Sequence, residues 1–134
     1  MSARQAARNQ DAVSAAGVPP LGALDAELAA LAGRHGVLVL LASRSDCPYC
    51  REVRRNYLAP LAREGQPRFA VRELESDTAA DTSALARLGI RFFPTVVFLG
   101  AGGRVLAEPL VGLDRAGFYA AYLDQRLTTA LAAA

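Results

Sequence analysis

The stretch VLVLLASRSDCPYC (Val37–Cys50) decides the fold. Its first half, VLVLLAS (37–43), is a continuous apolar run of strand length, which is typical of a central strand buried on both faces. Its second half contains the only two cysteines of the 134-residue chain, Cys47 and Cys50, and a helical pattern follows them. The cysteines are therefore predicted to lie at the junction between a buried strand and the N-terminus of a helix.

A cysteine at this junction is in position to act as a nucleophile. Unpaired backbone N–H groups and the helix dipole stabilise an anion there, and such thiols typically have a pKa lowered to roughly 3.5–7.5. Cys50 lies one helical turn further on the same face, where it can resolve a mixed disulfide formed at Cys47. Pro48 suits the first turn, because that position needs no N–H partner. The pattern predicts thiol–disulfide exchange with Cys47 attacking and Cys50 resolving.

Two other uses of the cysteine pair stay open. A purely structural disulfide would close a very short loop, which contributes little stabilisation. A zinc site needs four ligands, whereas the chain offers two cysteines and one histidine, His35. A carboxylate or a second copy of the chain would have to complete such a site. We expect no metal and no cofactor, and we expect His35 to have a structural role at a helix end.

The rest of the chain predicts alternating helices and strands. Helices are expected from Leu21 to Gly33, over residues 51–65 with a kink at Pro60, from Asp81 or Thr82 to Gly89, and after Asp114 with Phe118, Tyr122, Leu123 and Leu127 facing inward. Strands are expected over residues 68–74, 94–100 and 104–112, with a hairpin turn at 101–103 and Pro109 marking an edge strand. This order predicts an α/β fold with a mixed sheet of about four strands and helices on both faces.

Composition narrows the possible partners. A net charge of +2 with 21% charged residues does not indicate binding to nucleic acid or to an anionic membrane. No apolar run approaches the ~18 residues of a membrane span. Residues 1–20 are Ala-rich and polar, without the apolar core of a signal peptide, so we expect a flexible arm there and one domain over residues 21–134. The protein is either cytoplasmic or exported with its signal peptide absent from this chain.

A second motif, GIRFFPTVVFLGAGGRVLAEPLVG (Gly89–Gly112), leads to a family. With the C-x-x-C at a strand-to-helix junction, it makes the chain resemble thioredoxin-fold proteins from roughly Leu21 to Leu127. The resemblance implies the thioredoxin fold, with a cis-proline loop at Pro94 and Thr95 lying against the cysteines. It also implies that the backbone of Phe93 pairs with an extended substrate segment. Substrate contacts are therefore expected at Pro48, Tyr49, Phe93, Pro94 and Thr95.

The chain departs from classical thioredoxins inside and near the motif. Pro48-Tyr49 stands between the cysteines where thioredoxins have Gly-Pro, and the chain has no tryptophan. Leu41 occupies the position of the buried Asp that assists proton transfer in the family, so that relay is expected to be absent or replaced by water. Pro-Tyr resembles glutaredoxins, but Phe92-Phe93 before Pro94 differs from their Thr-Val. The lead-in SRSDCPYC is more similar to bacterial periplasmic thioredoxin-like reductases.

These observations predict a bacterial thiol–disulfide oxidoreductase that uses Cys47 and Cys50. We expect a monomer that reduces protein or small-molecule disulfides in the periplasm, with a redox partner protein and with no nucleic-acid partner and no membrane span. A cytoplasmic location is the alternative. Two alternative functions are a glutathione-dependent, glutaredoxin-like enzyme and a thioredoxin-fold module that binds a metal or a partner through the same surface.

Overall fold

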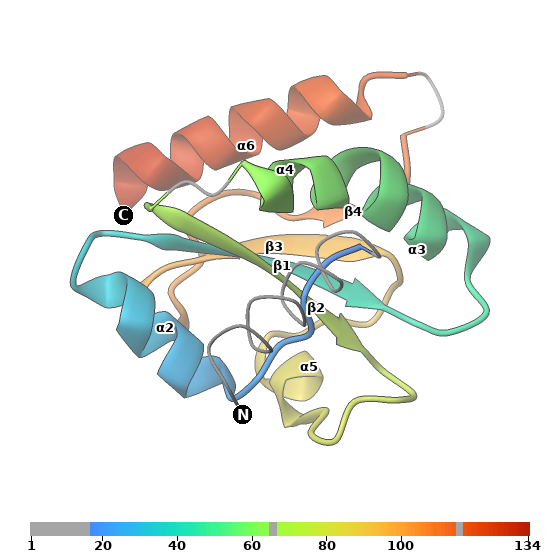
Figure 1. Ribbon diagram of the computed structural model, residues 1–134, viewed down its shortest axis with the longest axis horizontal. Helices are drawn as coiled ribbons and strands as arrows, with labels where there is room; N and C mark the ends of the chain where they lie inside the picture. Colours follow the sequence, from blue (N-terminus) through green and yellow to red (C-terminus); the bar gives the residue numbers. More distant parts are fainter. Residues whose placement is uncertain (1–16, 65–66, 115–116) are drawn as a thin grey trace, which may run out of the picture.

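A computed structural model describes residues 17–64, 67–114 and 117–134, and these form a mixed sheet between two layers of helices (Figure 1). The four strands of the sheet lie in the order β2–β1–β3–β4. β1 (Val37–Ser43) is parallel to β2 (Phe69–Glu75) and antiparallel to β3 (Thr95–Leu99), which pairs with β4 (Leu110–Val111). The predicted α/β class and mixed sheet are confirmed.

Strand β1 is central, as its apolar sequence predicted. All seven of its residues are buried, because β2 and β3 flank it and helices cover both of its faces. Val37, Val39 and Leu41 join the core on one face, and Leu38 and Leu40 join the core on the other. This two-faced burial fixes the end of β1, and therefore the position of the cysteine motif that follows it.

The helices divide between the two faces of the sheet (Figure 1). One face carries α2 (Leu24–Ala32) and α5 (Ser83–Arg87). The other carries α6 (Tyr119–Ala133) and a helical run made of α3 (Pro48–Val53), the π-helix η1 (Arg54–Leu58) and α4 (Ala59–Arg63). The short 3₁₀ turn η2 (Ala101–Gly103) follows β3.

The π-helix is how the chain accommodates Pro60. Proline has no N–H to donate within the helix, and its ring crowds the preceding turn. The helix widens just before it, so that the N–H of Ala59 bonds to the carbonyl of Arg54, five residues earlier. Where a kink at Pro60 was predicted, the structure has this π-helical turn directly before the proline, and the helical run continues from Pro48 to Arg63.

The fourth strand is much shorter than residues 104–112. Only Leu110 and Val111 form β4, and Val105 makes an isolated bridge to Leu99. Leu106 and Ala107 are adjacent and both belong to the core on the same face of the sheet, which the side-to-side alternation of a regular strand does not allow. Pro109, which has no N–H for a ladder, precedes the short strand.

The last helix buries Leu123 and Leu127 as predicted, but not the two aromatic residues expected beside them. Tyr119, Leu123, Leu127 and Ala130 are its buried residues. Phe118 and Tyr122 are 57% and 42% exposed, so the expectation that they face inward is wrong. Asp114 does accept a hydrogen bond of 2.7 Å from the N–H of Phe118, next to the start of the helix.

The expected flexible arm over residues 1–20 falls mostly on residues 1–16, which lie outside the described part. Residues 17–20 correct the expectation, because they are fastened to the edge of β2. Val18 is buried. The N–H of Glu73 donates to the carbonyl of Pro19 at 2.9 Å, and the N–H of Leu21 donates to the carbonyl of Glu73 at 2.8 Å. Because Leu21 is part of this extended segment, α2 starts only at Leu24.

Candidate active site

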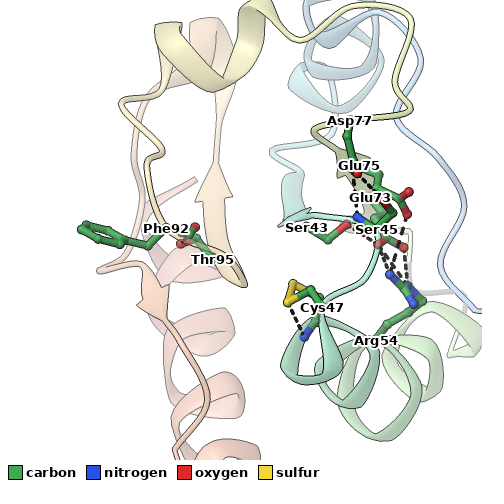
Figure 2. Close-up of a disulfide and its surroundings, with 10 residues drawn as sticks. Ser43, Ser45, Cys47, Arg54, Glu73, Glu75, Asp77, Phe92 and Thr95 are labelled. Atoms are coloured by element: carbon green, nitrogen blue, oxygen red, sulfur yellow. Dashed lines mark hydrogen bonds and ion pairs between the residues drawn. A yellow bond between two sulfur atoms is a disulfide. The ribbon is translucent and has the colours of Figure 1, made fainter.

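Cys47 and Cys50 meet at the start of α3, directly after the turn that leaves β1. They form a disulfide with a Cα–Cα distance of 5.2 Å (Figure 2). Cys47 is the N-cap residue of α3, and its Sγ accepts a hydrogen bond of 3.2 Å from the N–H of Cys50. Cys47 is 8% exposed, whereas Cys50 is fully buried. A partner molecule can therefore reach Cys47 first.

The helix start favours a negative charge on the sulfur of Cys47. The N-cap side chain lies among N–H groups that have no partner within the helix. The helical run extends over residues 48–63, which is long enough for its dipole to add to the effect. Pro48 occupies the first turn, where a missing N–H costs nothing. A free thiol here is placed to ionise more readily than an ordinary cysteine.

The proline loop lies beside the cysteine motif because of the strand register. Thr95, the first residue of β3, pairs with Ala42 near the end of β1. The Phe93–Pro94 peptide bond just before it is cis. The guanidinium of Arg44, in the turn before Cys47, lies 6.0 Å from the centre of the Phe93 ring. The structure thus brings this loop and the segment leading to the cysteines together.

Two hydrogen bonds to backbone carbonyls hold the proline loop in place. The hydroxyl of Thr95 donates to the carbonyl of Phe92 at 2.6 Å, and Thr95 is buried. The N–H of Gly112 donates to the carbonyl of Pro94 at 2.7 Å, which ties the loop to the end of β4. Figure 2 shows the side chain of Phe92 pointing away from the disulfide, and this ring is 68% exposed.

A groove borders the cysteine motif on the side of α6. It has a volume of about 410 Å³, and it is lined by Tyr49, Glu52, Tyr57, Leu113, Asp114 and Gly117. The side chain of Tyr49 is 42% exposed, although its neighbour Cys50 is buried. A larger groove of about 570 Å³ lies at the β2 edge between residues 18–23 and 73–81, and neither cysteine lines it. Neither cysteine lines the smaller groove either, but Tyr49, which stands between the two cysteines in the sequence, does.

A polar cluster that sequence reasoning missed lies under the motif. Glu73 accepts hydrogen bonds from Ser43 at 2.5 Å and from Arg54 at 2.6, 2.7 and 3.0 Å (Figure 2). The side chain of Glu73 is only 10% exposed. Glu73 pairs with Leu41 in the sheet, and Leu41 is fully buried. Hydrogen bonds from Arg54 to Glu73 raise the pKa of Arg54.

A second missed contact fixes the turn itself. Asp77, just beyond β2, accepts hydrogen bonds from both the N–H and the hydroxyl of Ser45. These bonds hold the pKa of the Asp77 carboxyl below its usual range. The sequence signal that could have indicated these contacts is the pair of serines at 43 and 45 together with the acidic residues at 73 and 77. Their pairing depends on the parallel register of β1 and β2, which the sequence does not state.

The remaining expectations concern a metal site, His35 and a membrane span. Within residues 17–64, 67–114 and 117–134, no group of three or more His, Cys, Asp and Glu side chains could hold a metal ion. His35 lies after α2 with a positive φ of 53°, and its carbonyl accepts a bond from Arg68. In the same part of the chain, no helix is both long enough and apolar enough to cross a bilayer.

Comparison with known proteins agrees with this geometry. A family model described as a thioredoxin-like domain matches residues 24–127. A thioredoxin of Malassezia sympodialis has a similar structure, with a TM-score of 0.59 and 19% identity over 85% of this chain and 90% of that chain.

A second similar chain comes from a structure concerned with thiol resolving in yeast mitochondrial 1-Cys peroxiredoxin via glutathione/thioredoxin systems. It has a TM-score of 0.61 and 14% identity, over 83% of this chain and 93% of that chain. No curated protein sequence matches significantly. At these identities the two structures show a shared fold.

Proposed function

Because the chain belongs to the thioredoxin-like domain family, we propose that it is a thiol–disulfide oxidoreductase whose redox centre is the Cys47–Cys50 pair. One observation carries the proposal: the two cysteines already form a disulfide at a helix N-terminus, with Cys47 the more accessible. A disulfide with a purely structural role would not require Cys47 to be the more accessible of the two cysteines. Disulfide-containing molecules and redox partner proteins are the partners that such a centre implies.

The proposed reaction transfers two electrons from the dithiol form of the protein to a substrate disulfide. The Cys47 thiolate attacks one substrate sulfur, and the S–S bond breaks to release the other sulfur as a thiolate, which takes up a proton. Cys50 loses its proton and attacks Cys47 Sγ, which releases the second substrate thiol. The protein is left as the Cys47–Cys50 disulfide, and a reducing partner must restore the dithiol.

We assign the protein more finely as a monomeric reductase of protein or small-molecule disulfides in a bacterial periplasm. This assignment is supported by the resemblance of SRSDCPYC to periplasmic thioredoxin-like reductases. For a protein substrate, the groove beside Tyr49 and Glu52 offers room for residues next to the attacked cysteine. Phe93 of the proline loop lies next to Arg44, and Thr95 pairs with Ala42 near the end of β1.

The decisive test is the reduction of insulin by dithiothreitol in the presence of the protein. The parent protein should accelerate it, and Cys47→Ser should abolish the acceleration. Cys50→Ser should trap a mixed disulfide at Cys47 that mass spectrometry detects. Equal rates for the parent and Cys47→Ser would refute the proposed function.

Three further measurements separate the finer alternatives. A reduction potential near −270 mV for the cysteine pair would agree with a reductase, whereas a value near −120 mV would indicate an oxidant. Saturable, glutathione-dependent turnover would replace the proposed partner with glutathione. Metal analysis of the purified reduced protein tests the binding-module alternative, since a stoichiometric metal on both cysteines would exclude a free redox pair.

A further inference from the structure

The turn formed by residues 44–46 joins the redox centre to two other parts of the molecule. It connects the end of β1 to Cys47. Arg44 lies against Phe93 of the proline loop, and Ser45 is bonded to Asp77 beyond β2. Asp46 adopts a left-handed conformation with φ of 55°. A change in this turn would therefore alter both the approach to Cys47 and the proline loop.

The left-handed residue makes the turn dependent on outside contacts. A side chain with a Cβ is disfavoured in this region of φ, although Asp tolerates it better than most residues. Cys47 follows Asp46 directly and has φ −128° and ψ 101°, an extended N-cap conformation. That conformation places its Sγ 3.2 Å from the N–H of Cys50. If the turn relaxed, the sulfur would lose this alignment with the helix start.

Asp77 is the main outside contact of the turn. One carboxylate oxygen accepts the N–H of Ser45 at 2.9 Å, and the other accepts the Ser45 hydroxyl (Figure 2). Ser76, its neighbour, donates its N–H to the carbonyl of Ser43 at 2.7 Å. Residues 76 and 77, just beyond β2, thus hold the last residue of β1 and the turn after it at two points, four and two residues before Cys47.

We propose that Asp77 is a positioning residue for disulfide exchange, acting through Ser45 to hold Cys47 at the helix N-terminus and Arg44 against Phe93. It touches neither cysteine, so its effect is on the orientation of the attacking sulfur and on the proline loop. The inference rests on the proposed function, since it assigns a role within that reaction. This role requires the two hydrogen bonds between Asp77 and Ser45, and it does not require the negative charge of Asp77.

Three variants and one control separate positioning from charge. Asp77→Ala removes both bonds to Ser45, and Ser45→Ala removes only the hydroxyl bond. Asp77→Asn removes the charge but keeps both contacts, since an amide oxygen can accept the Ser45 N–H and the amide N–H₂ can donate to the Ser45 oxygen. The matched control is Asp81→Ala, which removes an exposed acid whose carboxylate caps Ser83 in the same connection between β2 and α5.

The first measurement is the rate of iodoacetamide alkylation of the reduced proteins against pH, which reports the thiolate of the accessible cysteine. Loss of an aligned hydrogen bond to a charged sulfur should lower the rate, at pH values below the midpoint of the parent's profile, about tenfold in Asp77→Ala and about threefold in Ser45→Ala. The midpoint of the pH profile should rise by about one unit in Asp77→Ala. Asp77→Asn and Asp81→Ala should stay within twofold of the parent.

Insulin reduction gives the second readout. Asp77→Ala should show a raised KM as well as a lower kcat, because the loop holding Phe93 is disturbed together with Cys47. Alkylation rates within twofold of the parent for both Asp77→Ala and Ser45→Ala would overturn the proposal. So would an Asp77→Asn variant as slow as Asp77→Ala, since charge would then explain the effect. Alkylation needs only the thiol, so it tests positioning even if the parent reduces no insulin and the proposed function fails.

Discussion

Replacing Arg54 by Met should leave Glu73 as a nearly buried carboxylate with no counter-charge. In the structure, Arg54 supplies three hydrogen bonds to Glu73, at 2.6, 2.7 and 3.0 Å, and Ser43 supplies a fourth. Methionine keeps the length of the aliphatic stem, which lies near Gly17. The variant therefore removes the guanidinium while retaining most of the packing.

The size of the effect follows from the burial of the pair. Breaking a fully buried ion pair by removing one partner costs about 3–5 kcal/mol. Here the side chains of Arg54 and Glu73 are 21% and 10% exposed, so water can partly solvate the remaining charge. We therefore expect a loss of about 2–3 kcal/mol in the free energy of unfolding for Arg54→Met. The double variant Arg54→Met/Glu73→Met removes both charges and should lie within about 1 kcal/mol of the parent.

Urea denaturation of the oxidised proteins at pH 7 measures these differences. With slopes of about 1–3 kcal/mol per molar urea, Arg54→Met should lower the midpoint by roughly 1–2 M. The matched control is Arg87→Met, which breaks a pair with Asp25 whose side chains are 50% and 76% exposed. That substitution should leave the urea midpoint unchanged, because exposed pairs contribute little.

Two results would contradict this reasoning. An Arg54→Met variant within about 0.5 kcal/mol of the parent would mean that the pair is solvated like the Arg87–Asp25 pair. A double variant no more stable than Arg54→Met would mean that the loss comes from packing around Arg54, not from the carboxylate left behind.

Three further predictions concern other parts of the domain. The hydroxyl of Tyr119 is buried and has no hydrogen-bond partner among the described residues, and burial raises its pKa. Tyr119→Phe should therefore increase the free energy of unfolding, measured by urea denaturation, by up to about 1 kcal/mol. A loss of stability would instead point to a partner for the hydroxyl. A Cβ on Gly36 would lie 2.7 Å from Leu31 Cδ2, whereas one on Gly33 meets no atom within 4 Å. Gly36→Ala should thus lower the free energy of unfolding by about 1–3 kcal/mol, while Gly33→Ala should be neutral or stabilising. Similar urea midpoints for the two variants would refute the contact argument. Bonds from Ser45 lower the pKa of Asp77, so the stabilisation that the charged carboxylate contributes should be complete above about pH 4 and disappear as the pH falls through the folded-state pKa. The free energy of unfolding, measured between pH 2 and 6, should therefore fall less steeply with acid in Asp77→Asn than in the parent. Parallel pH dependence of the two proteins would contradict this.

Local sequence was enough for the features that depend on one segment. The apolar run of β1 predicted its central place, and the following C-x-x-C predicted the junction with α3, because both signals lie within fourteen consecutive residues. Pro60 predicted a disturbed helix, since its missing N–H acts within one turn. The proline loop came from the resemblance, and the strand register shows how it reaches the motif.

Features that depend on distant segments could not be predicted in this way. The sequence of the last helix offers two sets of apolar residues at helical spacing that could face the core. One set includes Phe118 and Tyr122, and the other includes Tyr119 and Leu123. Only the second continues to Ala130 and stays against the sheet. The partners of Glu73 are likewise set by the pairing of β2 with β1 and by the angle of the helix carrying Arg54. Neither of these is a property of a single segment.

The contacts of residues 17–21 bear on where the domain can be cut. The family model spans residues 24–127, but a fragment with those ends would leave the N–H of Glu73 without the carbonyl of Pro19 and the carbonyl of Glu73 without the N–H of Leu21. It would also lose Ala130, which is fully buried against the sheet. An unpaired strand edge is a template on which another chain can add. Excision at the family boundaries should therefore give an aggregation-prone fragment, whereas ends at residues 17 and 134 keep this edge of the sheet covered.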